Sequence, residues 1–168
     1  MNSGTLALAP AELALLIECR RGVLATSAAD GRARLVPITF AVAPWTDVSG
    51  RTLLYSALDE KPKSVADPRQ LARVRDIAAR PRVALLVDRW SEDWSELAWL
   101  RLEGEAALVE PAADWPDAGR HADAVRLLRQ RYPQYAGHRL EERPVLRVVC
   151  HRAVSWGLGA ETPLDSSA

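Results

Sequence analysis

The sequence predicts a mainly β fold: an antiparallel barrel of six strands, closed or nearly closed, with helices at its periphery. The expected elements run in the order helix, three strands, helix, two strands, helix, strand, without the regular alternation of a parallel sheet. Two β-leaning runs are joined by Asp30-Gly31, a pair that suits the positive φ angles of a tight hairpin turn. A long strand expected over residues 95–110 completes the pattern of a barrel.

Three helices are expected from the spacing of apolar residues. The first covers residues 10–21, and its apolar face should consist of Leu13, Leu16 and Ile17. The second covers residues 67–81, with Asp67 as its cap and an apolar face of Leu71, Val74 and Ile77. The third covers residues 117–132.

The first strands form a hairpin over residues 22–42. Pro37 has no amide proton to donate to a ladder, so the second strand should lie at an edge, carry a bulge or open toward a ligand. The remaining strands are expected over residues 51–58, 82–88, 95–110 and 144–159.

The composition is typical of one globular domain. The chain has 168 residues, of which 48% are hydrophobic and 26% are charged. These values and this length predict a single domain over residues 1–168. Its ordered core should cover about residues 10–158, and the tail after about residue 159 should be frayed.

Charge and hydropathy limit the partners. The formal net charge is zero, which gives no electrostatic reason to expect nucleic acid. No apolar run approaches the roughly 18–20 residues of a membrane span, and the first residues lack the pattern of a secretory signal. We therefore expect a cytoplasmic protein without a membrane or nucleic-acid partner. In that compartment Cys19 and Cys150 should be reduced thiols, with a disulfide as the less favoured alternative.

The motifs of several enzyme classes are missing from the sequence. His121, His138 and His151 lie far apart and lack metal-ligand spacing, so no metal site is expected. There is no G-x-S-x-G elbow, no G-x-G-x-x-G turn and no phosphate-binding G-x-x-x-x-G-K-[ST] loop. No catalytic acid, base or nucleophile can be nominated from these patterns.

Residues 61–82 carry an excess of positive charge, with seven basic residues and two acidic ones. Lys61 and Lys63 flank a proline that fixes the backbone, so their ammonium groups suit a phosphate. Arg73 adds a planar donor that can make a bidentate contact. The alternative is a solvated basic face, with Asp76 paired to Arg73 or Arg80 at helical spacing.

Several stretches, taken in order, resemble the split-barrel flavin- and deazaflavin-binding proteins related to pyridoxamine 5'-phosphate oxidase. They are "GVLATSAADGRARLVPITFAV", "DEKPK", "LARVRDIAARPRVALLVD", "DWSELAWLRLEGEA" and "VSWGL", spread over most of residues 22–158. The run from Lys61 to Ala106 most resembles the branch that depends on coenzyme F420. The resemblance implies an FMN-binding-like split barrel that forms a homodimer, with the cofactor in a groove between the subunits.

Carried over position by position, the resemblance also implies cofactor-binding residues. They are Val36, Pro37 and Ile38 against the ring, Ser56 and Ala57 beneath the cofactor chain, and Lys61, Lys63 and Arg73 at the phosphate, with Arg75 as a secondary candidate. The sequence departs from the family pattern at Asp76, where relatives often have Asn, and at Ser64, where a basic residue is frequent.

The resemblance implies an F420-dependent oxidoreductase that transfers a hydride between the deazaflavin and a small organic substrate. In such an enzyme the cofactor supplies the hydride chemistry, which accounts for the missing catalytic motifs. Two alternatives remain: an FMN-dependent oxidoreductase of the same fold, and a protein that binds or carries F420 without turnover.

Tryptophans offer a second feature of interest. Trp90, Trp94 and Trp99 cluster along the sequence and could wall a pocket for a planar ring. For Trp99 the favoured interpretation is packing in the barrel core or at a dimer interface. Trp156 lies on the last strand, which in relatives is close to the partner subunit's site.

Overall fold

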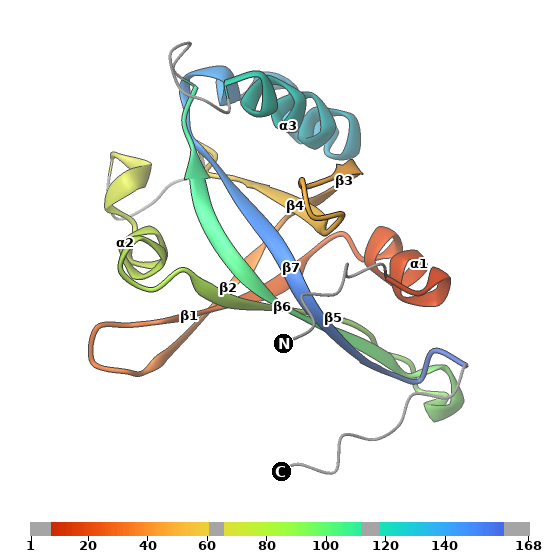
Figure 1. Cartoon of the computed structure of the whole chain (residues 1–168). Helices are drawn as coiled ribbons and strands as arrows, with labels where there is room; N and C mark the ends of the chain where they lie inside the picture. The colour runs from red at the N-terminus through yellow and green to blue at the C-terminus, as the bar shows by residue number, and fades with distance from the viewer. Residues whose placement is uncertain (1–7, 61–65, 112–117, 160–168) are drawn as a thin grey trace.

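Figure 1 presents a computed structural model of the protein, in which residues 8–60, 66–111 and 118–159 are described. One curved sheet holds seven strands in the order β2-β1-β5-β6-β7-β4-β3, and every neighbouring pair is antiparallel. The strands are β1 (Gly22–Ser27), β2 (Ala33–Ile38), β3 (Ala41–Thr46), β4 (Thr52–Ala57), β5 (Arg82–Arg89), β6 (Ala98–Val109) and β7 (Val145–Trp156).

Helices surround this sheet. They are α1 (Pro10–Glu18), α2 (Ala72–Ala79), α3 (Ala118–Arg131) and the short 3₁₀ segments η1 (Pro68–Gln70), η2 (Trp94–Glu96), η3 (Pro133–Gly137) and η4 (Leu140–Glu142). The predicted fold class, a mainly β antiparallel split barrel with peripheral helices, is confirmed. The predicted count of six strands is wrong, and within the described residues the edge strands β2 and β3 do not pair to close the barrel.

The extra strand arises because the chain breaks between β2 and β3. The Tyr132 hydroxyl accepts a hydrogen bond from the Phe40 amide at 3.1 Å and donates to the Phe40 carbonyl at 2.6 Å. The Tyr135 hydroxyl lies 2.6 Å from the Thr39 hydroxyl. Because the Tyr132 hydroxyl bonds both the amide and the carbonyl of Phe40, these groups do not pair with β1. The predicted second strand therefore ends at Ile38, and the chain continues as β3, which pairs with β4.

The hairpin prediction is confirmed. Strands β1 and β2 pair in register from Gly22 with Ile38 to Ser27 with Ala33, and Gly31 in the connecting turn has φ of 84°. Pro37 lies on β2, which is an edge strand as its missing amide proton predicts.

The helix predicted over residues 67–81 forms in two pieces. Asp67 caps η1, because its carboxylate accepts from the Arg69 amide at 2.9 Å. Leu71 then has the extended-like ψ of 138°, and α2 begins after it. In α1 the predicted apolar face is confirmed at Leu16 but wrong at Leu13 and Ile17, which are exposed, and Leu15 is buried instead. A helix this rich in apolar residues offers several equivalent faces, so spacing alone could not choose.

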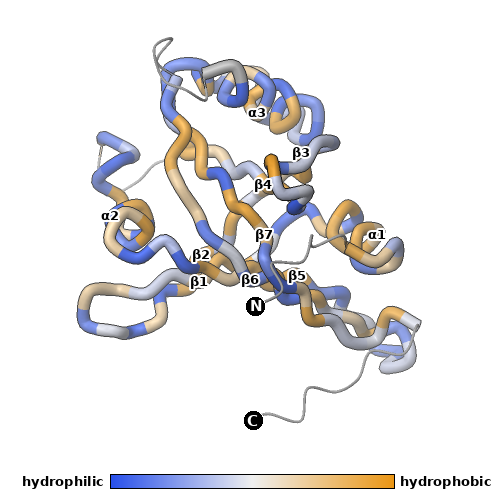
Figure 2. Tube along the Cα trace, viewed as in Figure 1, coloured by the Kyte–Doolittle hydropathy of each residue, from blue (hydrophilic) through white to orange (hydrophobic). Residues whose placement is uncertain are grey.

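Two hydrophobic cores lie on opposite sides of β4. One includes Leu54 and is covered by α1 and α2, while the other includes Tyr55 and is covered by α3. Figure 2 shows hydrophobic residues along the sheet and recurring along the helices. Cys19 and Cys150 are free thiols, and burial raises the pKa of Cys150 to about 12. Within the described residues, no helix combines the length and apolar character needed to cross a bilayer.

Candidate functional site

Asp59, directly after β4, joins two of the segments that were predicted to meet the cofactor. The Tyr135 hydroxyl donates to the Asp59 carboxylate at 3.1 Å and also lies 2.6 Å from the Thr39 hydroxyl. Thr39 directly follows Ile38, and Asp59 lies two residues beyond Ala57. The ends of β2 and β4 therefore meet around one tyrosine, although nearly twenty positions separate them in the sequence.

Arg73 lies close to the same junction. Its side chain is half-buried, and its Nε atom is buried without a hydrogen-bond partner among the described residues. Burial lowers the pKa of Arg73, whereas the charge of Asp59 raises it, so the two groups are near one another. A buried donor without a partner costs about 1–3 kcal/mol, which makes an anionic ligand a favourable partner for it.

Arg75 and Arg69, two other described residues of the basic segment, do not converge on Arg73. Arg75 lies two residues further along α2, so the two side chains project about 200° apart around the helix axis. Arg69 is held by Glu110, with Nη2 and Oε2 2.6 Å apart. Lys61 and Lys63, which were predicted to complete the phosphate site, lie outside the described residues. Of the predicted phosphate ligands that are described, the structure thus brings Arg73 to the junction and turns Arg75 away.

Asp76 does not pair as the alternative interpretation required. Its carboxylate accepts from Thr26 Oγ1 at 2.9 Å and from Arg34 Nε at 2.8 Å, so the predicted pairing with Arg73 or Arg80 is wrong. Burial would raise the pKa of Asp76, but the hydrogen bonds from Arg34 and Thr26 outweigh burial and hold the pKa below its usual value. Arg73 is therefore not neutralised by the acidic residue of its own helix.

The predicted ring-supporting residues differ in their exposure. Pro37 is exposed on the edge strand, whereas Val36 is half-buried and Ile38 is buried against the core. Ser56 and Ala57 are both buried, and Ala57 belongs to the core beneath α3. Among these five residues, Pro37 therefore presents the most accessible side chain.

Residues that follow α3 hold this part of the site in place, and the sequence did not identify them. The Arg143 Nε donates to the Leu58 carbonyl at 2.7 Å, and His138 Nδ1 accepts from the Glu60 amide at 3.2 Å. Together with Tyr135 they fix residues 58–60 at the end of β4. Tyr132, Pro133 and Tyr135 after α3 were the available signal in the sequence. A local sequence pattern, however, does not indicate which distant strand such residues contact.

One face of the sheet carries no helix over its centre, and the register identifies its residues. Directly paired residues lie on the same side of a sheet, which gives the rows Leu35, Ala25, Ala84, Glu103 and Arg152, and Pro37, Val23, Leu86, Arg101 and Val154. We call this surface the open face. Its neighbours along each strand, such as Leu24, Leu85 and Leu100, belong to the core.

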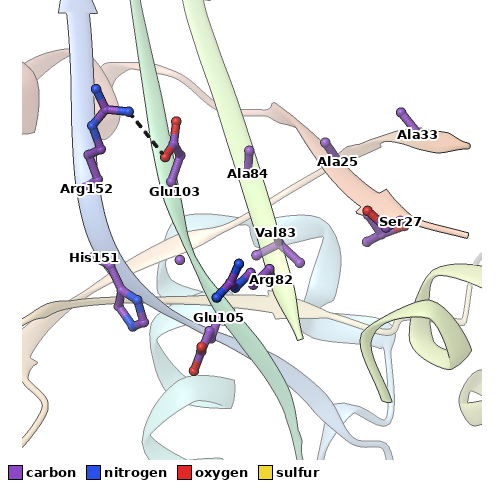
Figure 3. A pocket seen from close by; sticks show the side chains of 12 residues that line it. Ala25, Ser27, Ala33, Arg82, Val83, Ala84, Glu103, Glu105, His151 and Arg152 are labelled. Atoms are coloured by element: carbon purple, nitrogen blue, oxygen red, sulfur yellow. Dashed lines mark ion pairs between the residues drawn. The ribbon is translucent and has the colours of Figure 1, made fainter. Parts of the chain in front are cut away.

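A hollow of about 560 Å³ lies in the open face (Figure 3). Its charged lining includes Arg82, Glu105 and His151, together with an ion pair in which Arg152 and Glu103 approach to 3.7 Å. A register shift between Glu103 and Gly104 leaves His151 as the additional residue on β7. Of the predicted cofactor residues that the structure describes, none lines this hollow.

The tryptophans gather at one end of the open face. Trp99 and Trp156 are directly paired across β6 and β7, and Trp156 is 44% exposed. Trp90 and Trp94, in the segment between β5 and β6, are 71% and 75% exposed. The half-buried position of Trp99 on the sheet surface fits the predicted packing at an interface better than the predicted packing in the barrel core.

The sequence profile of the family described as Pyridoxamine 5'-phosphate oxidase matches residues 8–157, a stretch that contains all seven strands. The chain belongs to the pyridoxamine 5'-phosphate oxidase family. This membership confirms the coarser part of the resemblance, the FMN-binding-like split barrel. Among curated proteins, none matches the chain.

Several solved structures share the fold. Rv2991, a conserved hypothetical protein from Mycobacterium tuberculosis, has 22% identity and a TM-score of 0.63, with 94% of this chain and 92% of that one covered. A FAD-binding protein from Mesorhizobium loti has 18% identity and a TM-score of 0.56, covering 88% and 94%. HutZ, the heme storage protein from Vibrio cholerae, has 13% identity and a TM-score of 0.59, covering 90% and 94%. Because their named ligands differ, the shared fold does not select a cofactor.

Proposed function

We propose that the protein binds coenzyme F420 and acts as an F420-dependent oxidoreductase on a small organic substrate. The observation that carries this proposal is Arg73, a half-buried guanidinium whose Nε lacks a partner in the described chain. A desolvated arginine beside the end of a strand is suited to a phosphate, since it offers several donors in a fixed plane.

The residues present fit such a cofactor. Arg73 would hold the phosphate together with Lys61 and Lys63, and Asp59 would keep Arg73 charged and oriented without competing as a full ion pair. Pro37 would contact the ring from the edge strand, with Val36 and Ile38 behind it and Ser56 and Ala57 beneath the cofactor chain. When bound, the deazaflavin would supply the hydride chemistry, and the protein would supply binding, orientation and exclusion of water.

FMN is the first alternative cofactor, since a FAD-binding protein has the same fold. Both ligands combine a tricyclic ring with a phosphate, so Arg73 alone does not separate them. Titration of the purified protein with F420 and with FMN distinguishes the two. We expect tighter binding of F420; tighter binding of FMN would replace F420 as the cofactor.

Turnover separates an enzyme from a carrier. The protein loaded with reduced F420 should oxidise it in the presence of at least one member of a panel of enones, quinones and tetrapyrroles. Binding of F420 without oxidation by any member of the panel would favour the carrier that was the second alternative.

We also propose that the protein is a homodimer that pairs through the open face. This face exposes large apolar residues, including Leu35 at 65% on the edge strand β2 and Leu86 at 41% on the inner strand β5. Contiguous exposed apolar surface of this kind marks interaction sites. A second copy placed there would adjoin the edge strand β2 and Pro37, so the cofactor would lie beside the interface.

A further inference from the structure

We propose a second anion site, separate from Arg73, in a cavity of about 440 Å³ between the β1–β2 hairpin and α2. Six charged residues line it: Asp30, Arg32, Arg34, Arg75, Asp76 and Arg80. Four arginines against two aspartates leave a formal excess of two positive charges. We call this cavity the arginine pocket.

Two of the arginines are held in place by the fold. Arg34 Nε donates to Asp76 Oδ2 at 2.8 Å, and the same oxygen also accepts from Thr26 Oγ1 at 2.9 Å. Arg80 donates to the carbonyls of Ala28 and Ala29 at 3.4 and 3.3 Å, which ties the end of α2 to the hairpin. These contacts fix the guanidinium groups before any ligand arrives, which lowers the entropic cost of binding.

Arg75 carries one of the two charges that no carboxylate of the pocket neutralises, since Arg80 bonds only backbone carbonyls. Arg75 is exposed and makes no ion pair or hydrogen bond within the part of the chain that the structure describes. The positive charge of Arg75 helps to lower the pKa of Asp76. The Asp76 carboxylate, however, already accepts hydrogen bonds from Arg34 and Thr26. Arg75 is therefore available to a ligand, and Arg32 on the facing hairpin, paired only with exposed Asp30, can swing toward the same ligand.

The chemistry of the arginine pocket selects a small oxyanion with two or more negative charges. Guanidinium groups bind phosphate and carboxylate oxygens by paired, charge-assisted hydrogen bonds. A single charge would leave the pocket with a net excess, whereas a dianion balances it. The ligand thus carries a phosphate ester or several carboxylates. This inference does not rest on the proposed F420 site, because Arg73 does not line the pocket.

Calorimetric titration with two probes, inorganic pyrophosphate and citrate, tests the proposal. The titrations use the Arg73→Gln protein, so that the cofactor phosphate site is weakened, and are repeated with Arg75→Gln added. We expect the second substitution to weaken binding about ten-fold, since it removes a charge-assisted contact. Asp30→Asn, which removes a competing negative charge, should strengthen binding. Arg126→Gln, on an exposed arginine of α3, is the matched control and should leave affinity unchanged.

Each outcome decides the proposal. Binding of pyrophosphate alone identifies a phosphate site, binding of citrate alone identifies a carboxylate site, and both support the arginine pocket if Arg75→Gln weakens them selectively. The proposal is overturned if neither probe binds the Arg73→Gln protein. It is also overturned if Arg75→Gln and Arg126→Gln have equal effects. Since F420 affinity is measured separately, failure here leaves the proposed function intact.

Discussion

At the scale of single residues, the site depends on how buried charges are matched. The Asp76 carboxylate accepts hydrogen bonds from Arg34 and Thr26, and the Asp59 carboxylate accepts one from the Tyr135 hydroxyl. Arg73 lies near Asp59, yet its Nε has no partner among the described residues. This difference between satisfied and unsatisfied groups distinguishes a structural charge from one that suits a ligand.

Asp76→Asn should reduce the free energy of unfolding at neutral pH and make it depend less on pH in the acidic range. Because the folded pKa of Asp76 is depressed, its contribution is present above the unfolded pKa of about 3.9 and is lost as pH falls through the folded pKa. We expect a loss of about 1–2 kcal/mol at pH 7, since the partner Arg34 is partly solvent-screened. Urea unfolding across acidic pH measures it. Asp30→Asn, at an exposed pair, should leave the unfolding midpoint unchanged.

Tyr135→Phe should make the free energy of unfolding depend less on pH in the alkaline range. Burial, the largest influence, and the nearby Asp59 raise the pKa of Tyr135 to about 12. A raised folded pKa gives stability that is fully present below the unfolded value of about 10 and is lost as pH rises through 12. The variant should be less stable at neutral pH by about 1–3 kcal/mol, because Asp59 loses a donor. Equal alkaline slopes of unfolding free energy in the two proteins would contradict this.

At the scale of elements, the break between β2 and β3 gives the site its shape. It turns the chain after Ile38, so that Thr39 reaches Tyr135 and, through it, Asp59. Tyr132, whose hydroxyl bonds the amide and carbonyl of Phe40, directly follows α3, and Tyr135 lies in η3. The segment after α3 therefore sets both the strand count and the geometry of the junction.

Tyr132→Phe should destabilise the protein by about 1–3 kcal/mol. The amide and carbonyl of fully buried Phe40 would lose the hydroxyl that bonds them, and buried polar groups without partners carry that cost. Urea unfolding at neutral pH provides the measurement. A variant as stable as the parent would mean that the hydroxyl does not impose the break.

Local chemistry made most of the elements predictable. The Asp30-Gly31 turn, the edge position of Pro37 and the cap at Asp67 each depend on a residue's own backbone preference, and all three occur. The strand break and the burial of Asp59 depend on Tyr132 and Tyr135, which lie more than 70 residues away in sequence. Periodicity carries no information about such contacts, so one strand was missed and the junction was not foreseen.

At the scale of the whole molecule, one part of the sheet surface, the open face, has no helix over it. The open face combines apolar residues such as Leu86 with the exposed aromatic side chain of Trp156. The two helix-covered cores lie on opposite sides of β4, one beneath α1 and α2 and the other beneath α3. This asymmetry is what a subunit of a symmetric dimer would present.

Leu86→Arg should shift the protein from dimer to monomer in sedimentation experiments. Leu86 is 41% exposed in the single chain, so the substitution should leave the fold intact while introducing facing charges across the two-fold interface. Val48→Arg, in the exposed turn between β3 and β4, is the matched control and should remain dimeric. A parent protein that is monomeric at all concentrations would contradict the proposed pairing.

The central claim is that Arg73 holds the phosphate of a bound deazaflavin, and equilibrium titration with F420 tests it most directly. The parent protein should bind F420, and Arg73→Ala should bind it about ten- to a hundred-fold more weakly, as expected for loss of charge-assisted hydrogen bonds. Arg126→Ala should bind like the parent. Equal affinities of the Arg73→Ala and parent proteins, or no binding of F420 by the parent, would contradict the claim.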